Sequence, residues 1–310
     1  MKTIVVASGK GGAGKTSFTA SFMAWLHGQG IRAVAADADV DAANLGLALK
    51  AGEPSERSTY IAGDAWEVRA EACTGCGACA AACRFDAISL ASGAARIDPF
   101  SCERCGACAD VCPTGAIKSV PAVAGELLRS PIAYGEALAH GELIPGEDAS
   151  GKLVRQVRES AARIAGHEGL VVVDAPPGIG CPAMAAISGA GLLVVLVEAG
   201  ASGIRDAARL LDNAAIAKVP AVAVLNKAGL SAERDSEARN LAAERGLDVL
   251  GRIPFDPAFR LAAERGGTWL DSGAPGPVEA VREACAAVAA RAGLIPTTSP
   301  AGDAPERTAP

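Results

Sequence analysis

Residues 8–17 read SGKGGAGKTS, and this stretch decides the fold. It contains the spacing Gly-x4-Gly-Lys-Thr directly after the apolar run TIVVA (3–7), and the following SFTASFMAWLHG has the pattern of a helix. A glycine-rich turn between a buried strand and a helix lets backbone N–H groups converge on phosphate oxygens, and the helix start adds partial positive charge. We therefore predict a phosphate-binding loop rather than a chance glycine-rich turn.

Within this loop, Lys15 is expected to reach the β- and γ-phosphates of a nucleotide, and the Thr16 hydroxyl is expected to bind Mg²⁺. The loop also carries a second lysine, Lys10, which taken by itself would be an ordinary solvated side chain. The predicted nucleotide-binding residues are Gly9, Lys10, Gly11, Gly12, Ala13, Gly14, Lys15, Thr16, Ser17 and, far along the chain, Asn226.

Short apolar runs recur between longer helical stretches in the first and last thirds of the chain. The runs are TIVVA (3–7), AVAA (33–36), LVVVD (170–174), LLVVLV (192–197), AVAVLN (221–226) and the weaker GLDVLGRIP (246–254). Such runs are typical of strands buried on both faces. The predicted fold is an α/β P-loop NTPase with a mostly parallel sheet, helices on both faces, and a small inserted module.

The composition of the 310 residues narrows the function. Half of them are hydrophobic and 21% are charged, which is typical of a folded globular protein. The net charge of −6 and the lack of a basic run argue against nucleic-acid binding. No apolar stretch is long enough to cross a bilayer, no basic amphipathic helix suggests a membrane anchor, and the beginning MKTIVVASGKGG does not resemble a secretory signal. We expect a cytoplasmic protein.

Eight of the ten cysteines lie between residues 73 and 112, in two runs of C-x2-C-x2-C-x3-C offset by 29 residues. This is the spacing of bacterial-type ferredoxins, in which the fourth cysteine of each run ligates the other cluster. We therefore assign one [4Fe–4S] cluster to Cys73, Cys76, Cys79 and Cys112, and a second to Cys83, Cys102, Cys105 and Cys108. Zinc also accepts C-x2-C pairs, but it explains neither the four-cysteine runs nor the repeat.

The repeat sets the predicted domain boundaries. Residues 67–120 are expected to form the ferredoxin-like insertion, with two short strands joined at Ser92-Gly93, and residues 1–66 and 121–295 the discontinuous ATPase domain. The Pro/Ser/Thr-rich segment 296–310 is expected to be a disordered tail. The first cysteine run ends in Cys83-Arg84, where the usual proline is missing; this changes local charge but removes no ligand.

The loop KGGAGKT resembles the deviant phosphate loop of the MinD/ParA/nitrogenase-iron-protein ATPases. The resemblance implies that Lys10 reaches across a two-fold dimer to the nucleotide of the other chain, where a cation stabilises charge that develops during phosphoryl transfer. AADADVDAANL (35–45) resembles the family's switch I, with Asp39 orienting the attacking water and contributing to the Mg²⁺ site; Asp37 is either part of this switch or a helix cap. VVVDAPPGIGCP (171–182) resembles the switch II segment, with Asp174 holding Mg²⁺.

Two further positions follow from the same resemblance. Asn226 lies where the family contacts adenine, and the following KAG lacks the aspartate that a guanine site uses, so ATP is favoured over GTP. IPFDP (253–257) lies where the family packs backbone against the base, or is a plain turn. Cys181 falls near the position of a cluster-bridging cysteine in the nitrogenase iron protein, although a small buried thiol is the simpler interpretation.

Taken together, the chain resembles the MinD-superfamily ATPases that contain an inserted ferredoxin domain, and PGEDASGKLVRQVR (145–158) matches that group as well. The leading hypothesis is an ATPase whose nucleotide state is coupled to two [4Fe–4S] clusters, for gated electron transfer or metallocofactor assembly. Its expected partners are a second copy or a related ATPase, and a redox or metallocofactor-recipient protein. The alternatives are a spatial or cell-division regulator that uses the clusters as a redox sensor, and an amidating synthase, which would need a separate source of ammonia.

Overall fold

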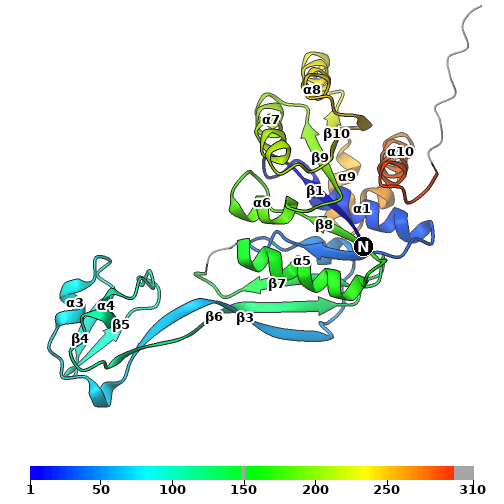
Figure 1. Ribbon diagram of the computed structural model, residues 1–310. Helices are drawn as coiled ribbons and strands as arrows, with labels where there is room; N and C mark the ends of the chain where they lie inside the picture. Colours follow the sequence, from blue (N-terminus) through cyan, green and yellow to red (C-terminus); the bar gives the residue numbers. More distant parts are fainter. Residues whose placement is uncertain (148–150, 297–310) are drawn as a thin grey trace, which may run out of the picture. The chain divides into compact units, whose positions relative to one another are not determined.

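One sheet of nine strands organises most of the chain in the computed structural model, which describes residues 1–147 and 151–296 (Figure 1). The strand order is β11-β10-β9-β1-β8-β2-β7-β6-β3. Among the described residues, every neighbouring pair from β11 to β7 is parallel. In the same order, the strands are Val249–Pro254, Ala221–Ala228, Leu192–Glu198, Lys2–Ala7, Leu170–Asp174, Val34–Asp37, Leu138–Leu143, Ile117–Ser130 and Glu56–Val68.

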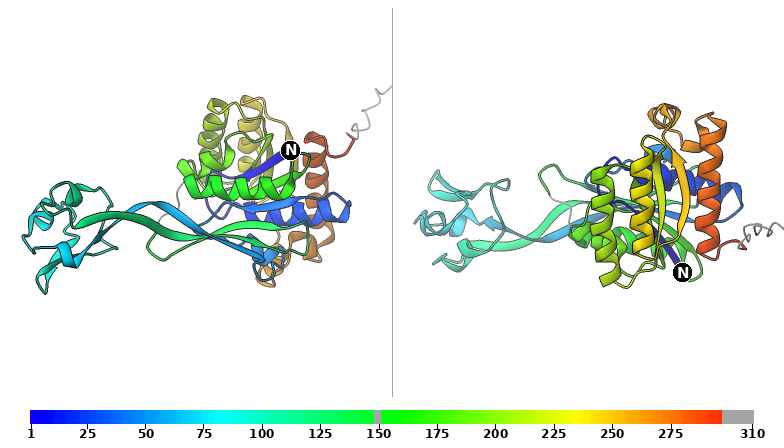
Figure 2. Two further views of the ribbon diagram at one scale, coloured as in Figure 1. Left: turned by 60° about the horizontal axis from the view of Figure 1, so that its bottom comes forward. Right: turned by 90° about the horizontal axis from the view of Figure 1, so that it is seen from above.

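Helices cover both faces of the parallel part, as Figure 2 shows. Helix α1 (Lys15–Gly28) packs with α10 (Pro275–Arg291), and α1 also contacts the short α2 (Leu45–Ala48). The other face carries a row of helices in mutual contact: α5 (Gly151–Ala165), α6 (Cys181–Ile187), α7 (Ala201–Ile216) and α8 (Ala232–Glu244). Helix α9 (Pro257–Glu264) contacts the 3₁₀ turn at Trp269–Asp271. The predicted α/β architecture is confirmed.

Burial in the core explains why the central strands consist of unbroken apolar runs. Both faces of β1, β8 and β9 are covered, so nearly every residue in them is buried. On one side the strands meet the apolar stripe of α1, where the rings of Phe18 and Phe22 stack 6.3 Å apart and Met23 and Leu26 are fully buried. The sheet and α1 are thus fixed by burial of large side chains, and the loop that joins β1 to α1 is held between them.

The chain divides into two compact units, of which the second comprises residues 58–126 and 143–147 of the described chain. It contains the outer parts of β3 and β6, the 3₁₀ turn Ala70–Ala72, α3 (Ala78–Ala82), β4 (Ile88–Ala91), β5 (Ala94–Ile97) and α4 (Ala107–Asp110). Strands β4 and β5 pair antiparallel across Ser92 (φ 53°) and Gly93 (φ 82°), which confirms the hairpin expected there.

The boundaries of this second unit are wider than the predicted insertion over 67–120. The unit begins at Ser58 and extends to Glu126, because β3 and β6 are long strands that continue beyond the cysteine runs. It also takes residues 143–147, where the Ile144 N–H donates to the Ala124 carbonyl. The predicted tail 296–310 lies, apart from its first residue, outside the described residues. None of the described helices has the length and apolarity that crossing a bilayer requires.

Candidate functional site

The phosphate loop runs from the end of β1 to the start of α1. Gly14 precedes the helix with φ 93° and ψ 17°, a left-handed conformation that glycine adopts without strain. A side chain at this position would also collide with the amide nitrogen of Asn226, 2.5 Å from an added Cβ. Lys15 is the first residue of α1 and is buried to 6% exposure, with its side chain lining a cavity of about 610 Å³. The loop therefore has the conformation that the sequence motif predicts.

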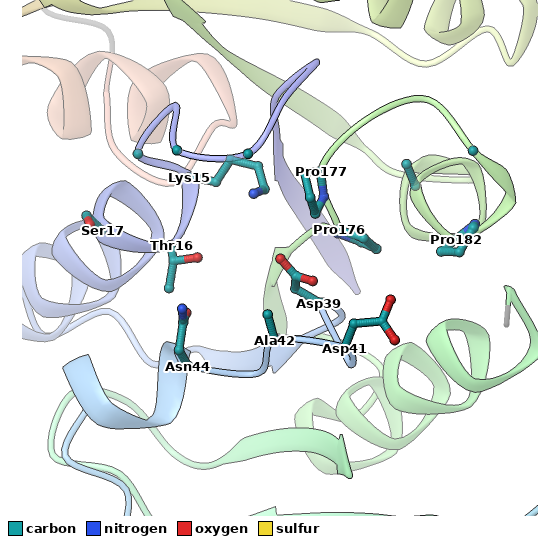
Figure 3. A pocket seen from close by; sticks show the side chains of 15 residues that line it. Lys15, Thr16, Ser17, Asp39, Asp41, Ala42, Asn44, Pro176, Pro177 and Pro182 are labelled. Carbon is teal, nitrogen blue, oxygen red and sulfur yellow. The ribbon is translucent and has the colours of Figure 1, made fainter. Parts of the chain in front are cut away.

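Part of the predicted site lines this cavity, namely Gly11, Gly12, Gly14, Lys15, Thr16, Ser17 and Asp39, whereas Gly9, Lys10, Ala13, Asp174 and Asn226 do not line it. Lys15, Thr16 and Ser17 come from the loop, and Asp39 from the segment after β2, while Pro176 and Pro177 close the cavity from the segment after β8. Figure 3 shows Lys15, Thr16 and Asp39 directed toward a common space. The carboxyl ends of parallel strands meet at one edge of a sheet, which is why segments so distant in sequence come together here.

Asp174 is the central carboxylate of the site. It is the last residue of β8 and is fully buried, with the Thr16 hydroxyl donating to Oδ2 at 2.5 Å and the Thr19 hydroxyl lying 3.2 Å from Oδ1. Burial raises the pKa of Asp174 to about 6, although Lys15 and the Thr16 hydroxyl act in the opposite direction. An ionised, desolvated carboxylate beside a threonine hydroxyl is an arrangement that favours a divalent cation.

Two further aspartates follow β2. Asp37 pairs in register with Asp174 and accepts hydrogen bonds from the N–H groups of Asp39 (3.2 Å) and Leu45 (3.0 Å). Burial and the nearby Asp174 charge raise the pKa of Asp37 well above its ordinary value. Asp37 thus holds the backbone of the segment that follows β2. A helix-capping role was one of the two roles that the sequence suggested for Asp37. Asp39 lines the cavity, and burial raises the pKa of its carboxyl.

The segment after β8, which the sequence predicts to be a switch, makes backbone hydrogen bonds to the end of β1 and to the first residue of the loop. The N–H of Ala175 donates to the Val6 carbonyl at 3.0 Å, and the N–H of Gly178 donates to the Ser8 carbonyl at 3.1 Å. Cys181 is exposed at the start of α6, immediately after this segment, so its interpretation as a small buried thiol is wrong.

Asn226 and Lys10 have protein partners. The buried Asn226 amide donates to the Ala13 carbonyl at 2.8 Å, so it braces the loop from β10, and its contact with an adenine stays a prediction. Lys10 does not line the cavity; its Nζ lies 2.9 Å from Glu198 Oε1 and 3.0 Å from Ser202 Oγ. The sequence motif did not indicate Glu198, nor the cavity-lining Asp41 and Asn44.

The cysteines occupy two structurally repeated loops in the second unit. Gly77 and Gly106 precede α3 and α4 with nearly equal backbone angles (φ 81° and 82°), and these short helices each carry a buried cysteine, Cys79 and Cys108. The sequence repeat is thus a repeat of conformation. Both buried thiols belong to the small core of this unit, together with Ala95 and Ile117.

The four cysteines that the sequence assigns to the first cluster line one small cavity of about 10 Å³: Cys73, Cys76, Cys79 and Cys112. Backbone N–H groups donate to two of their sulfurs, from Ala95 to Cys73 at 3.4 Å and from Ala116 to Cys112 at 3.3 Å. A hydrogen bond with Thr114, helped by backbone N–H groups, lowers the pKa of Cys112 to about 7.

In the second set, burial raises the pKa of Cys108, and the neighbouring thiols Cys102 and Cys105 add to the effect. The N–H of Arg104 donates to Cys102 Sγ at 3.4 Å. Across the part of the chain that the structure describes, no three His, Cys, Asp or Glu side chains are grouped closely enough to hold a single metal ion.

Comparison with known proteins identifies the family of this chain. The model of the CobQ/CobB/MinD/ParA nucleotide binding domain matches residues 4–269, which is most of the chain. The chain belongs to the CobQ/CobB/MinD/ParA family. An uncharacterized protein of Methanocaldococcus jannaschii is 33% identical over 228 residues, covering 74% of this chain and 79% of that protein.

Solved structures of family members share the fold at low sequence identity. The septum site-determining protein MinD of Pyrococcus horikoshii, complexed with Mg-ADP, superposes with a TM-score of 0.60 at 19% identity over 94% of this chain and 98% of that one. The McdA(D38A)–ATP complex of Cyanothece gives 0.55 at 19% identity (96% and 98% coverage). Cobyrinic acid a,c-diamide synthase of Mycobacterium smegmatis, with an ATP analog and magnesium, gives 0.52 at 16% identity (97% and 100% coverage).

Proposed function

We propose that the chain is a Mg²⁺-dependent ATPase whose nucleotide state is coupled to two [4Fe–4S] clusters. The observation that carries the proposal is the occurrence, in one chain, of a phosphate-loop cavity around Lys15 and of a separate cavity lined by four cysteines in ferredoxin spacing. The phosphate-loop cavity alone would indicate an ATPase with no redox function. The cysteine-lined cavity alone would indicate a simple electron carrier.

In the ATPase site, the backbone N–H groups of the loop and Lys15 would bind the phosphates. Thr16 and Asp174, already in contact, would hold Mg²⁺, and Asp39 would orient the attacking water from the opposite wall of the cavity. Family structures with ATP or ADP and magnesium support this assignment of the ligand. Lys15 and Asp174 are both buried, which strengthens their electrostatic interactions with a bound ligand.

Hydrolysis needs more positive charge than one chain places at the cavity. Among the described residues that line it, Lys15 is the cationic side chain, and Lys10 is directed elsewhere. We therefore assign the second cation to Lys10 of a partner chain, either a second copy or a related ATPase. A cation supplied from a partner accelerates phosphoryl transfer by about 10³-fold or more, so hydrolysis would require two chains to meet.

The cysteine loops fit iron–sulfur ligation. The exposed Cys76 and Cys105 and the buried Cys79 and Cys108 lie on loops bent by left-handed glycines, and backbone N–H groups already point at several sulfurs. Such N–H donors stabilise negative charge on cluster sulfurs. Cys73, Cys76, Cys79 and Cys112 would hold one cluster, and Cys83, Cys102, Cys105 and Cys108 the other. When bound, the clusters would supply one-electron transfer.

The two activities serve either ATP-gated electron delivery or metallocofactor assembly in a recipient protein. The test is anaerobic reconstitution, followed by EPR spectra and redox titration of the clusters with no nucleotide, with MgADP and with MgATP. We expect the MgATP sample to differ in spectrum, potential or rate of reduction of an acceptor, and the Lys15→Ala protein to show no such difference. Identical behaviour in all three nucleotide states would exclude gating.

A further inference from the structure

Three charged residues form a cluster behind the phosphate loop. The carboxylate of Glu198 accepts from Lys10 Nζ at 2.9 Å through Oε1 and from Lys227 Nζ at 3.1 Å through Oε2. Lys227 also donates to the Gly12 carbonyl at 2.9 Å, and Lys10 donates to Ser202 Oγ at 3.0 Å. Glu198 therefore bridges Lys10, which belongs to the loop, and Lys227, which donates a hydrogen bond to the loop. We define these three residues as the Glu198 cluster.

The fold holds Glu198 in one place. It is the last residue of β9, it pairs in register with Asn226 of β10, and α7 lies so close that a Cβ on Gly203 would be 2.6 Å from the Glu198 carbonyl oxygen. The side chain is 18% exposed. Burial alone would raise the pKa of Glu198, but hydrogen bonds from Lys10 and Lys227 outweigh it and leave this pKa below its ordinary value.

The backbone of Lys10 is also fixed. The Ser8 hydroxyl donates to the Lys10 carbonyl at 2.7 Å, and a Cβ on the preceding Gly9 would collide with the backbone of Asp206 in α7, 2.2 Å away. The loop thus cannot carry Lys10 to a new position without leaving α7. The four-carbon side chain of Lys10 can leave Glu198 by rotation alone.

We propose that Glu198 is a positioning residue that holds Lys10 within its own chain until nucleotide and a partner chain compete for it. This inference rests on the proposed function, because it requires that Lys10 act on the nucleotide of a partner. Lys10 exchanges one anion, the Glu198 carboxylate, for another, the partner's phosphates. Glu198 retains Lys227 after the exchange, so the step leaves no unpaired buried carboxylate, whose cost would otherwise oppose it.

The size of the effect follows from the symmetry of the dimer. Two Lys10 side chains must leave two Glu198 carboxylates for each dimer formed. A partly exposed ion pair contributes a few-fold to an equilibrium, and two such pairs multiply. Replacing Glu198 by glutamine, which keeps the shape and removes the charge, should therefore tighten nucleotide-dependent dimerisation by about tenfold.

The first experiment measures the dimer dissociation constant by sedimentation with Mg²⁺ and a non-hydrolysable ATP analogue. We compare wild type, Glu198→Gln, Lys10→Ala and the double variant, with Lys227→Gln as the matched control that removes the other lysine of the cluster. We expect Glu198→Gln to tighten the wild-type dimer about tenfold, to change the Lys10→Ala protein less than twofold, and Lys227→Gln not to tighten it. An unchanged or weaker Glu198→Gln dimer, or an equal effect without Lys10, would overturn the inference.

The second experiment does not depend on dimerisation. The reactivity of individual lysines toward acetic anhydride is followed by mass spectrometry in the dilute, nucleotide-free protein. The Lys10 amine should be acetylated several-fold faster in Glu198→Gln than in wild type, and Lys152, outside the cluster, should react equally in both. Equal Lys10 reactivity would overturn the inference. Faster labelling without any nucleotide-dependent dimer in wild type would instead support the contact and refute the proposed trans role of Lys10.

Discussion

Asp174 is placed where its charge opposes folding, and this gives a prediction with a defined sign. The carboxyl is fully buried, and burial raises its pKa from an ordinary 3.8 to about 6. A proton on Asp174 is therefore bound more tightly by the folded chain than by the unfolded one. The resulting stability is fully present below pH 3.8 and is lost as the pH rises through about 6. At neutral pH, without Mg²⁺, the ionised Asp174 should destabilise the ATPase unit.

The substitution Asp174→Asn removes the charge and keeps the shape. A shift of about two pKa units corresponds to about 3 kcal/mol at pH 7.5. The Thr16 and Thr19 hydroxyls donate to different oxygens of Asp174, and in asparagine one of these becomes an NH₂ group that cannot accept, which offsets part of the gain. We expect a net stabilisation of about 2 kcal/mol, or a rise in Tm of about 4–8 °C for a domain of this size.

The assay is thermal or urea unfolding in EDTA at pH 7.5, 5.5 and 4.5. The advantage of Asp174→Asn should shrink steadily and be close to zero at pH 4.5, where the cost of the charge has fallen to about 1 kcal/mol and the weaker hydrogen bonding offsets it. Asp235→Asn is the matched control, because Asp235 is equally buried but paired with Arg252, and this pair outweighs burial and lowers its pKa. That substitution should destabilise the protein at pH 7.5.

A second measurement distinguishes the role of the Asp174 charge in ligand binding from its effect on the stability of the fold. Saturating Mg²⁺ and ATP should stabilise wild type by about 3 kcal/mol at a hundred times the dissociation constant, and should stabilise Asp174→Asn much less. The reasoning fails if Asp174→Asn is less stable than wild type at pH 7.5, or if its advantage is the same at all three pH values.

Three further outcomes follow from the proposed function. Lys10→Ala should still bind ATP but lose nucleotide-dependent dimerisation and about 10³-fold in hydrolysis; normal turnover would refute a trans role. Asp39→Asn should bind MgATP and form the dimer while hydrolysing it at least a hundredfold more slowly, measured by phosphate release. Cys112→Ser should lower the iron content of the anaerobically reconstituted protein by up to half, whereas Cys181→Ser should leave it unchanged; equal losses would show that Cys181 is a ligand.

The parallel half of the fold could be predicted from the sequence because its strands are buried on both faces. LVVVD and LLVVLV contain almost nothing but β-branched and apolar residues, and both are strands in the structure. The outer strands β3 and β6 carry no such signal. ERSTYIAGDAWEV has exposed charged positions throughout and glycine and aspartate near its middle, so nothing in its local pattern distinguishes it from a loop.

The site residues also divide into those that the sequence predicts and those that it does not. Lys15, Thr16 and Asp174 could be placed from the sequence because the loop and the strand end each carry a local pattern. Glu198 could not, since it is one acidic residue after a strand and only tertiary structure brings it to Lys10. The hydrogen bond from the Asn226 amide to a carbonyl of the loop is likewise specified by no sequence pattern, and the contact of Asn226 with a base stays a prediction.

The charges around the loop explain how one small segment can act as a switch. Without nucleotide, the cations at the loop are paired with protein carboxylates: Glu198 is shared by Lys10 and Lys227, and the charge of Lys15 lowers the pKa of the nearby Asp174. Phosphates would take over both roles, so that Lys15 moves from a carboxylate field to a phosphate, Asp174 becomes available to Mg²⁺, and Lys10 is released to a partner. Under the proposed function, part of the free energy of nucleotide binding would therefore go into moving Lys10 and the segment after β8 rather than into affinity.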